Sequence, residues 1–371
     1  MPIRSIAKSV LFTGARRLGM NALLRRASKG RPLVLAYHGV VSDDHPDDLL
    51  RTREAVSLRE FRQQLADIRR LFTPISATDL LDFIEGKASL PTYPVLITFD
   101  DGFRNNLTCA APELQRQGVP ALIHITTGMI GRDRLLWTQE LNERILGWPR
   151  KTLPLPESRP DVETPPEGAA RIGIADHVRV LCKRIPDRVR EAYLDRLREE
   201  PLPRGEAWHR ELYDFLSWDD VRSLSRKGFA IGSHTVGHRI LTRIGPERLE
   251  HELCASKAMI ERQLGQECPW IAYPNGRAGD FSPEVLRATH KAGYKIGFTL
   301  TGRLGSRRPD PLQVARTCIS GQLPEDEFHA RISGILGVKR MLGGRKPYDV
   351  TDSNRTDHGI FGTAGAVCRV G

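Results

Sequence analysis

The chain has 371 residues, 40% of them hydrophobic, and a formal net charge of +11. That length allows one large α/β domain or two medium ones, with a core that needs no disulfide bonds for stability. No apolar stretch reaches the roughly 18 to 20 residues of a membrane-spanning helix, and the six scattered cysteines form neither a Cys-x-x-Cys pair nor a zinc-finger spacing, which favours a reduced, cytoplasmic protein.

The N-terminal arm, residues 1–31, carries most of the excess charge. It holds eight Lys or Arg residues and no acidic residue, so it supplies 8 of the 11 excess charges and leaves 3 for the rest of the chain. In helical register Ile3, Leu11 and Leu18 share one face, and such a basic arm can lie on an anionic membrane surface, here the inner membrane. A solvated extension or a docked N-terminal helix fits the same residues. The nearly neutral body gives no indication of nucleic-acid binding.

Six short apolar runs predict buried strands, at residues 33–37, 95–99, 121–126, 229–233, 270–273 and 295–300. Amphipathic stretches between them predict helices, most clearly at 58–71 and 246–264. Strands that alternate with helices form parallel β-α-β units, so the expected architecture is an α/β barrel or a doubly wound sheet.

The alternation is interrupted over residues 138–216. A proline-rich piece and charged helical stretches lie there, which predicts a helical insertion that serves as a lid or as a substrate-facing subdomain. Residues 337–371 are rich in Gly, Arg, Asp and Thr without apolar periodicity, which predicts a disordered tail. The main domain is therefore expected to span residues 32–336, between the basic arm and the tail.

Two polar motifs stand where predicted strands end. Asp100 and Asp101 follow the second strand within Thr-Phe-Asp-Asp-Gly, and His234 and His238 follow the fourth within His-Thr-Val-Gly-His. Taken singly, the first motif fits a simple turn and the second fits two solvated histidines. Because parallel strands end on one face of the sheet, where α/β proteins build their sites, the two motifs together predict a functional site.

The chemistry of these four side chains points to a metal-dependent hydrolase. Asp101, His234 and His238 form an O/N/N set that suits Zn²⁺ or another first-row divalent ion and leaves coordination positions open. Such an ion lowers the pKa of a bound water to about 7. Asp100, the neighbouring carboxylate, is then the candidate base that takes a proton from that water.

These motifs resemble those of the polysaccharide deacetylase family, the NodB-homology or carbohydrate esterase family 4 proteins. Tyr-Pro-Asn-Gly at residues 273–276 is similar to the family's third motif, in the form found in exopolysaccharide-linked members, and the resemblance covers residues 32–137 and 216–320. It implies a distorted (β/α) barrel with fewer than eight strands, a metal on Asp101, His234 and His238, and Asp100 as base.

The resemblance also implies that a backbone N–H at the third motif holds the oxyanion. Proline has no N–H, so the donor must be Tyr273 or a residue after Pro274. An aromatic side chain that packs on the barrel rim is the alternative for Tyr273. The arginine that usually accompanies this motif and positions the base is missing from residues 268–272, and Arg277 is the nearby substitute.

The general acid is not found where the family usually places it. The family's C-terminal Leu-x-His motif is missing, and His329, in an expected helix at 325–335, is a poor replacement. His38 follows the first predicted strand and resembles the acid of poly-N-acetylglucosamine deacetylases, in which the last motif is permuted towards the N-terminus. We therefore expect His38 to protonate the leaving amine. A strand-end histidine bonded to backbone groups is the alternative.

The predicted function is removal of N-acetyl groups from an N-acetylated polysaccharide or oligosaccharide such as a chitooligosaccharide or exopolysaccharide. The same motifs fit an esterase or amidase that acts on another acylated substrate, and a glycan- or membrane-binding protein without turnover. Of the remaining candidates, Trp137 and Trp218 could stack on a sugar but are expected to pack at the edges of the insertion, and His124 is expected to be a core histidine rather than a ligand.

Overall fold

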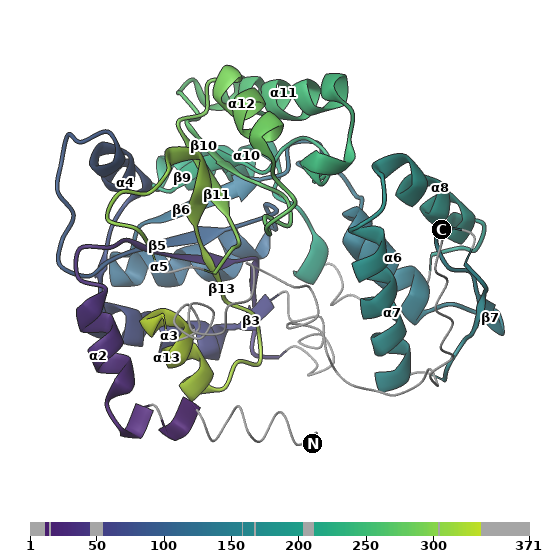
Figure 1. Cartoon of the computed structure of the whole chain (residues 1–371), viewed down its shortest axis with the longest axis horizontal. Coiled ribbons are helices and arrows are strands. Elements are labelled where there is room, and N and C mark those ends of the chain that lie inside the picture. The colour runs from purple at the N-terminus through teal and green to yellow at the C-terminus, as the bar shows by residue number, and fades with distance from the viewer. Residues whose placement is uncertain are drawn as a thin grey trace, which may run out of the picture.

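The computed structural model describes residues 12–14, 16–44, 55–157, 159–166, 168–202, 211–302 and 305–334. They form a barrel of strands surrounded by helices and, beside it, a separate lobe made by the predicted insertion (Figure 1). None of the helices in these ranges combines the length and the apolar character that crossing a membrane requires.

The barrel is built on six parallel strands that match the six predicted ones. They are β1 (Leu33–Tyr37), β5 (Pro94–Phe99), β6 (Ala121–Ile125), β9 (Ala230–Ser233), β10 (Trp270–Ala272) and β11 (Ile296–Thr299). The hydrogen-bonded order is β12-β11-β10-β9-β6-β5-β1-β13, where β12 (Val314–Ala315) and β13 (Thr317–Cys318) have two residues each. The distorted (β/α) barrel implied by the family resemblance is confirmed. Within the described ranges the strand order contains eight strands, and the expected count of fewer than eight applies only when the two-residue strands β12 and β13 are left out.

Residues 314–318 close the barrel. β12 pairs with β11 through Phe298 and Val314, and two residues later β13 pairs with β1 through Ala36 and Cys318. Arg316 is the single residue between these two short strands. The two ends of the strand order are thus joined by one continuous piece of chain, with Arg316 at the junction.

Helices cover the outside of the barrel. They are α2 (Met20–Ala27), α3 (Leu58–Leu71), α4 (Ala77–Ile84), the π-helical turn η2 (Asn106–Ala110), α5 (Ala111–Gln117), α10 (Trp218–Arg226), the short η3 (Leu241–Arg243), α11 (Pro246–Leu264), α12 (Pro283–Lys291), η4 (Pro311–Gln313) and α13 (Glu325–Ser333). Short strands β2 (Gly39–Val41) and β3 (Ala55–Ser57) pair beside the barrel, and β4 (Thr73–Pro74) pairs with β5.

Local chemistry explains the two helices that the sequence predicted most clearly. Ser57 caps α3 in a capping box, because its hydroxyl accepts from the Glu60 N–H while the Glu60 carboxylate accepts from the Ser57 N–H. α11 begins with Pro246 and ends at Leu264, and the following Gly265 has φ 68°, the left-handed conformation that glycine favours after a helix. Both helices have the predicted limits, 58–71 and 246–264.

The insertion folds around a hydrophobic core of its own. Its elements are α6 (Trp137–Leu146), β7 (Thr152–Leu153), β8 (Val162–Glu163), α7 (Ala169–Cys182) and α8 (Asp187–Arg198). Leu141, Val178 and Leu194, one from each helix, are completely buried in that core. Three helices thus lie in the described part of the predicted insertion, whereas the predicted tail, 337–371, lies outside the described residues.

Candidate metal and hydrolase site

Parallel strands bring the chemically interesting side chains to one end of the barrel. β1 ends just before His38, β5 just before Asp100, and β9 just before His234. Tyr37 pairs with Phe99 across β1 and β5, and the N–H of Asp100 donates to the carbonyl oxygen of Tyr37 at 2.9 Å. The common direction of the strands therefore places the residues that follow them on the same face.

Asp101, His234 and His238 converge as predicted. Asp101 Oδ1 lies 3.4 Å from His234 Nε2 and 3.3 Å from His238 Nε2, and all three ligand atoms lie within 4.8 Å of one another. Ligands at about 2.0 to 2.2 Å from a tetrahedral Zn²⁺ are about 3.3 Å apart. These distances fit a divalent ion held by one carboxylate oxygen and two imidazole nitrogens.

The two histidines are prepared to act as neutral ligands. His234 Nδ1 donates to the carbonyl oxygen of Ala272 at 2.7 Å, so the proton is on Nδ1 and the lone pair of Nε2 faces Asp101. Burial lowers the pKa of His234 to about 4. Burial, together with the neighbouring His234, lowers the pKa of His238 well below its ordinary value. A proton therefore does not compete with a metal for these nitrogens at neutral pH.

The backbone at the site adopts conformations that non-glycine residues rarely use. Asp101 has φ 72°, Thr235 φ 68°, His238 φ 53° and Asn275 φ 61°, which are four of the six positive values among the described non-glycine residues. Such conformations persist where surrounding contacts enforce them, and they cluster at functional sites. Gly102, with φ 86°, completes the turn after Asp101, and a Cβ there would stand 3.1 Å from the Ile125 side chain.

Asp100 is held by a buried arginine. Its carboxylate accepts one hydrogen bond from each terminal nitrogen of Arg316, both at 2.7 Å, and Arg316 also donates to the Thr98 hydroxyl at 3.0 Å. Burial raises the pKa of Asp100, but the charge of Arg316, the neighbouring His234 and the hydrogen bonds from His124 and Arg316 together more than offset this effect, so the pKa lies well below its ordinary value. Asp100 is therefore kept as an oriented carboxylate.

His124 is the second side chain that contacts Asp100. Its Nδ1 lies 3.1 Å from Asp100 Oδ1, and its ring packs edge-on against Phe298. Burial lowers the pKa of His124, so the ring is neutral and donates through Nδ1–H. The expectation of a core histidine was right about its burial and did not foresee this contact.

The arginine sought near the third motif lies elsewhere in the chain. Arg277 was the expected substitute, but the arginine that contacts the Asp100 carboxylate is Arg316, 216 residues after Asp100 in the chain. Apolar periodicity does not mark Arg316, because the strands on either side of it have only two residues each. Its signal in the sequence was a lone arginine within the short run Val-Ala-Arg-Thr-Cys-Ile, residues 314–319.

The expected role of the Tyr273 N–H is wrong. That N–H donates to the carbonyl oxygen of Phe298 at 3.0 Å, because Tyr273 continues the pairing of β10 with β11, and its phenol donates to the Leu312 carbonyl oxygen. Tyr273 is completely buried, as the packing alternative expected. After Pro274, the N–H of Gly276 is also engaged, whereas that of Asn275 donates to no group in the described part of the chain.

His38 and His329 lie in different surroundings. His38 is half-buried, its carbonyl oxygen accepts from the Asn106 side chain at 2.9 Å, and its charge contributes to the low pKa of His238, which places it near the metal ligands. His329 lies in α13, where Nε2 is 3.1 Å from Asp67 Oδ2. Asp67, Glu325 and His329 form a second cluster at ligand spacing. Arg70 pairs with Asp67 and Arg16 pairs with Glu325, so arginines neutralise the acidic groups of this cluster.

The model of the polysaccharide deacetylase family matches residues 87–297, more than half of the chain. The chain belongs to the polysaccharide deacetylase family. This assignment agrees with the resemblance expected from the three motifs and with the enzyme class that they predict. His38 and Arg316 both lie outside the matched residues.

Individual relatives are distant. YxkH of Bacillus subtilis, whose name assigns it provisionally to the polysaccharide deacetylases, is 28% identical over 120 residues, which are 32% of this chain and 42% of that protein. The Streptococcus pyogenes deacetylase PplD in complex with acetate superposes with a TM-score of 0.54 at 17% identity, covering 81% of this chain and 98% of PplD. IcaB from Ammonifex degensii gives 0.52 at 20% identity, covering 82% and 97%. At these identities the two structures support the fold.

Proposed function

We propose that this protein is a divalent-metal-dependent deacetylase that removes N-acetyl groups from the sugars of a polysaccharide or oligosaccharide. The observation that carries the proposal is the convergence of Asp101, His234 and His238 at ligand spacing, with the oriented carboxylate of Asp100 beside them. Membership of the polysaccharide deacetylase family supports an acetylated glycan as the substrate class.

Asp101, His234 and His238 would hold the metal, and Zn²⁺ suits their O/N/N set. When bound, a divalent ion of this kind supplies Lewis acidity that activates a water and polarises the amide carbonyl group. The protein's own contribution is to keep these imidazoles buried and neutral, so that protons do not compete with the metal for their nitrogens. The carbonyl oxygen of Ala272 fixes the ring of His234.

Asp100 acts as the base in this proposal. Arg316 and His124 orient its carboxylate from two sides and keep it ionised, so it can accept a proton from the attacking water. A base with a low pKa accepts a proton well only when the donor has itself become acidic, which fits a site that also binds a divalent ion.

The remaining roles fall to Asn275 and His38. With the Tyr273 N–H engaged, the Asn275 N–H is the candidate donor to the developing oxyanion at the third motif. His38, near His238 and partly accessible, would protonate the departing amine, which releases acetate and a free amino sugar.

The direct test measures acetate and free amine released from a panel of N-acetylated glycans by metal-stripped and metal-restored protein. We expect turnover that disappears with the metal and returns with Zn²⁺ or Co²⁺. Activity on O-acetyl esters alone would assign the site to an esterase. Tight glycan binding without turnover on any acylated substrate would contradict the proposed hydrolase.

We also propose that the arm makes peripheral contact with an anionic membrane. In its described part Leu18 is 81% and Leu23 65% exposed, and the exposed Arg17 and Arg26 lie near them in sequence. Sedimentation with vesicles should show binding to vesicles that contain anionic lipid and none to neutral vesicles, and L18S/L23S should weaken it. Equal binding to both kinds of vesicle, or no binding, would contradict this contact.

A further inference from the structure

The loop that carries His238 is hydrogen-bonded to the insertion. Trp137, the first residue of α6, donates from its indole Nε1 to the carbonyl oxygen of His238 at 3.1 Å. Trp137 is only 7% exposed, so this hydrogen bond is shielded from water. A residue of the insertion therefore contacts the backbone of a proposed metal ligand directly.

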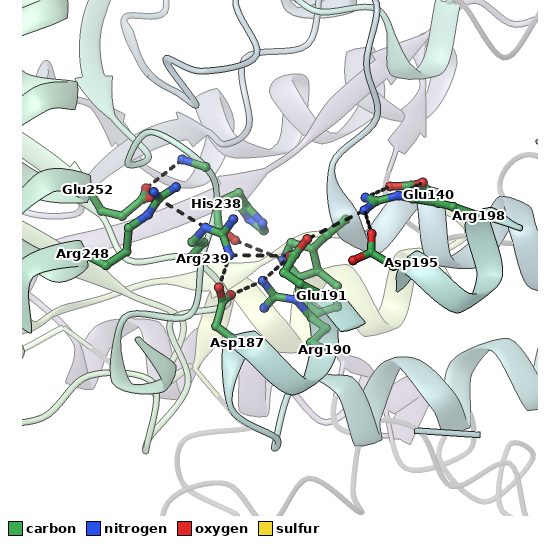
Figure 2. A network of polar contacts seen from close by, with 12 residues as sticks. Glu140, Asp187, Arg190, Glu191, Asp195, Arg198, His238, Arg239, Arg248 and Glu252 are labelled. Atoms are coloured by element: carbon green, nitrogen blue, oxygen red, sulfur yellow. Dashed lines mark hydrogen bonds and ion pairs between the residues drawn. The ribbon is translucent and has the colours of Figure 1, made fainter. Parts of the chain in front are cut away.

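The next residue along the loop is bound to the insertion by charge. Arg239 pairs with Asp187 and, at 3.5 Å, with Glu191, both on α8 (Figure 2). On its other side Arg239 Nε lies 3.7 Å from Glu252 of α11, a helix of the barrel. Arg239 thus lies between acidic groups of the two lobes.

The third contact that anchors this loop to the insertion, after the Trp137 hydrogen bond and the Arg239 ion pairs, is hydrophobic. Ile240 is 1% exposed, and it belongs to the core of the insertion, together with Leu141 of α6 and Leu194 of α8. The loop thus leaves the barrel at His238 and buries its next apolar side chain in the other lobe. Three successive residues, 238 to 240, are each attached to the insertion by a different kind of contact.

The anchors are linked to one another. The guanidinium of Arg190 stacks over the Trp137 ring at 4.2 Å from the ring centroid. It also pairs with Asp187, the partner of Arg239 (Figure 2). Arg190 is almost completely buried. Trp137 and Arg239 are therefore held by one network, whose members fix one another's orientation.

The barrel supports the same loop from the opposite side. The buried carboxylate of Glu252 accepts from the N–H of Val236 at 2.9 Å and from that of Gly237 at 2.7 Å. A second bond between the lobes lies at the third motif, where Lys183 at the end of α7 donates to the Asn275 side chain at 2.8 Å. The insertion thus contacts two of the three motif loops.

We infer that the insertion is a structural part of the metal site and that Trp137 and Arg239 are positioning residues that act through His238. The inference rests on the proposed metal-binding function of Asp101, His234 and His238. His238 occupies a positive-φ conformation, φ 53°, which its neighbours must enforce. The anchors on Arg239 and Ile240 and the bond to its carbonyl oxygen hold that conformation, so that Nε2 points at Asp101 before any metal arrives.

The test compares metal affinity in matched pairs of variants. W137F removes the indole N–H and keeps an aromatic ring under Arg190; its control is W148F, which removes a buried indole N–H that donates to the Thr152 carbonyl oxygen within the same lobe. R239Q removes the ion pairs at the loop; its control is R150Q, whose arginine pairs with Glu200 on the insertion. Zn²⁺ dissociation constants are measured by competition with a chelator, and the melting temperature of each metal-free protein is recorded separately.

Loss of an outer partner of a metal ligand costs about 10- to 100-fold in affinity. We expect W137F and R239Q each to bind Zn²⁺ at least about 10-fold more weakly than their controls, and the visible spectrum of the Co²⁺ form to change in these two variants alone. If all four variants bind Zn²⁺ as the parent protein does, the insertion does not position His238. If the parent protein binds no metal, the proposed function itself fails.

Discussion

Arg316 donates two hydrogen bonds of 2.7 Å to the carboxylate of Asp100, and both side chains are almost entirely buried. Arg316 is also the residue at which the barrel closes, between β12 and β13. A guanidinium presents its donors in a fixed plane, so this pair sets the plane of the carboxylate as well as its charge. The orientation of the proposed base therefore depends on closure of the barrel.

Replacing Arg316 by lysine should separate orientation from charge. R316K keeps a positive charge near Asp100 but cannot form the paired hydrogen bonds. Hydrogen bonds to charged groups contribute about 1.5 to 3 kcal/mol, so we expect kcat to fall by about 10- to 100-fold while bound Zn²⁺ is retained. Steady-state kinetics and zinc content check this, and an unchanged kcat would show that charge alone is needed.

The two adjacent aspartates should fail in different ways. D100N is expected to keep its metal and lose turnover by about 10² to 10⁴-fold, the usual contribution of acid-base assistance. D101N is expected to lose the metal, because it removes the carboxylate that faces both imidazoles. Metal content by atomic absorption beside acetate release distinguishes them, and equal metal loss in the two variants would contradict this division of roles.

His124 should matter through one hydrogen bond. H124F keeps a ring against Phe298 but removes the donor to Asp100, so we expect kcat to fall about 10-fold or more. H124N places an amide N–H where Nδ1 donates and should recover part of the loss. If H124F and H124N are equally impaired, and equally destabilised in thermal melts, packing rather than hydrogen bonding explains the residue.

His38 should be needed more for amides than for esters. An amine is a poor leaving group until it is protonated, so H38A should slow deacetylation of N-acetylated sugars by about 10² to 10⁴-fold. An activated O-acetyl ester needs this proton less and should be affected less. Near-normal rates on an N-acetylated oligosaccharide would assign the acid role to another group.

Thiol reactivity should follow burial. Burial raises the pKa of Cys182 to about 12 and that of Cys268 to about 12, whereas Cys254 is exposed. The thiolate is the nucleophile, and at pH 8 a thiol with a pKa near 12 is ionised to only about 1 part in 10⁴. Mass spectrometry after brief iodoacetamide treatment should therefore find Cys254 alkylated before Cys182 and Cys268, which should react only after unfolding. Early modification of Cys268 would indicate local opening around β10.

Much of the barrel could be predicted because its signals are local. Apolar runs located the six longer strands to within about two residues, and the caps of α3 and α11 are encoded next to the helices they limit. The convergence of Asp101 with His234 and His238 could be predicted as well, since parallel strands must end on the same face. For these strands, helices and ligands, the local sequence pattern and the common direction of parallel strands were sufficient.

Contacts between segments that are distant in the chain could be identified only from the tertiary structure. Arg316 sits in a stretch too short to show periodicity, and the Tyr273 N–H is engaged because of its place in the pairing of β10 with β11. The sequence alone determined the strands, two clear helices, the family and the proposed metal ligands. The tertiary structure decided what holds them: Arg316 and His124 on Asp100, and the insertion on the His238 loop. These contacts depend on which faces meet after folding, and neither composition nor local spacing records that.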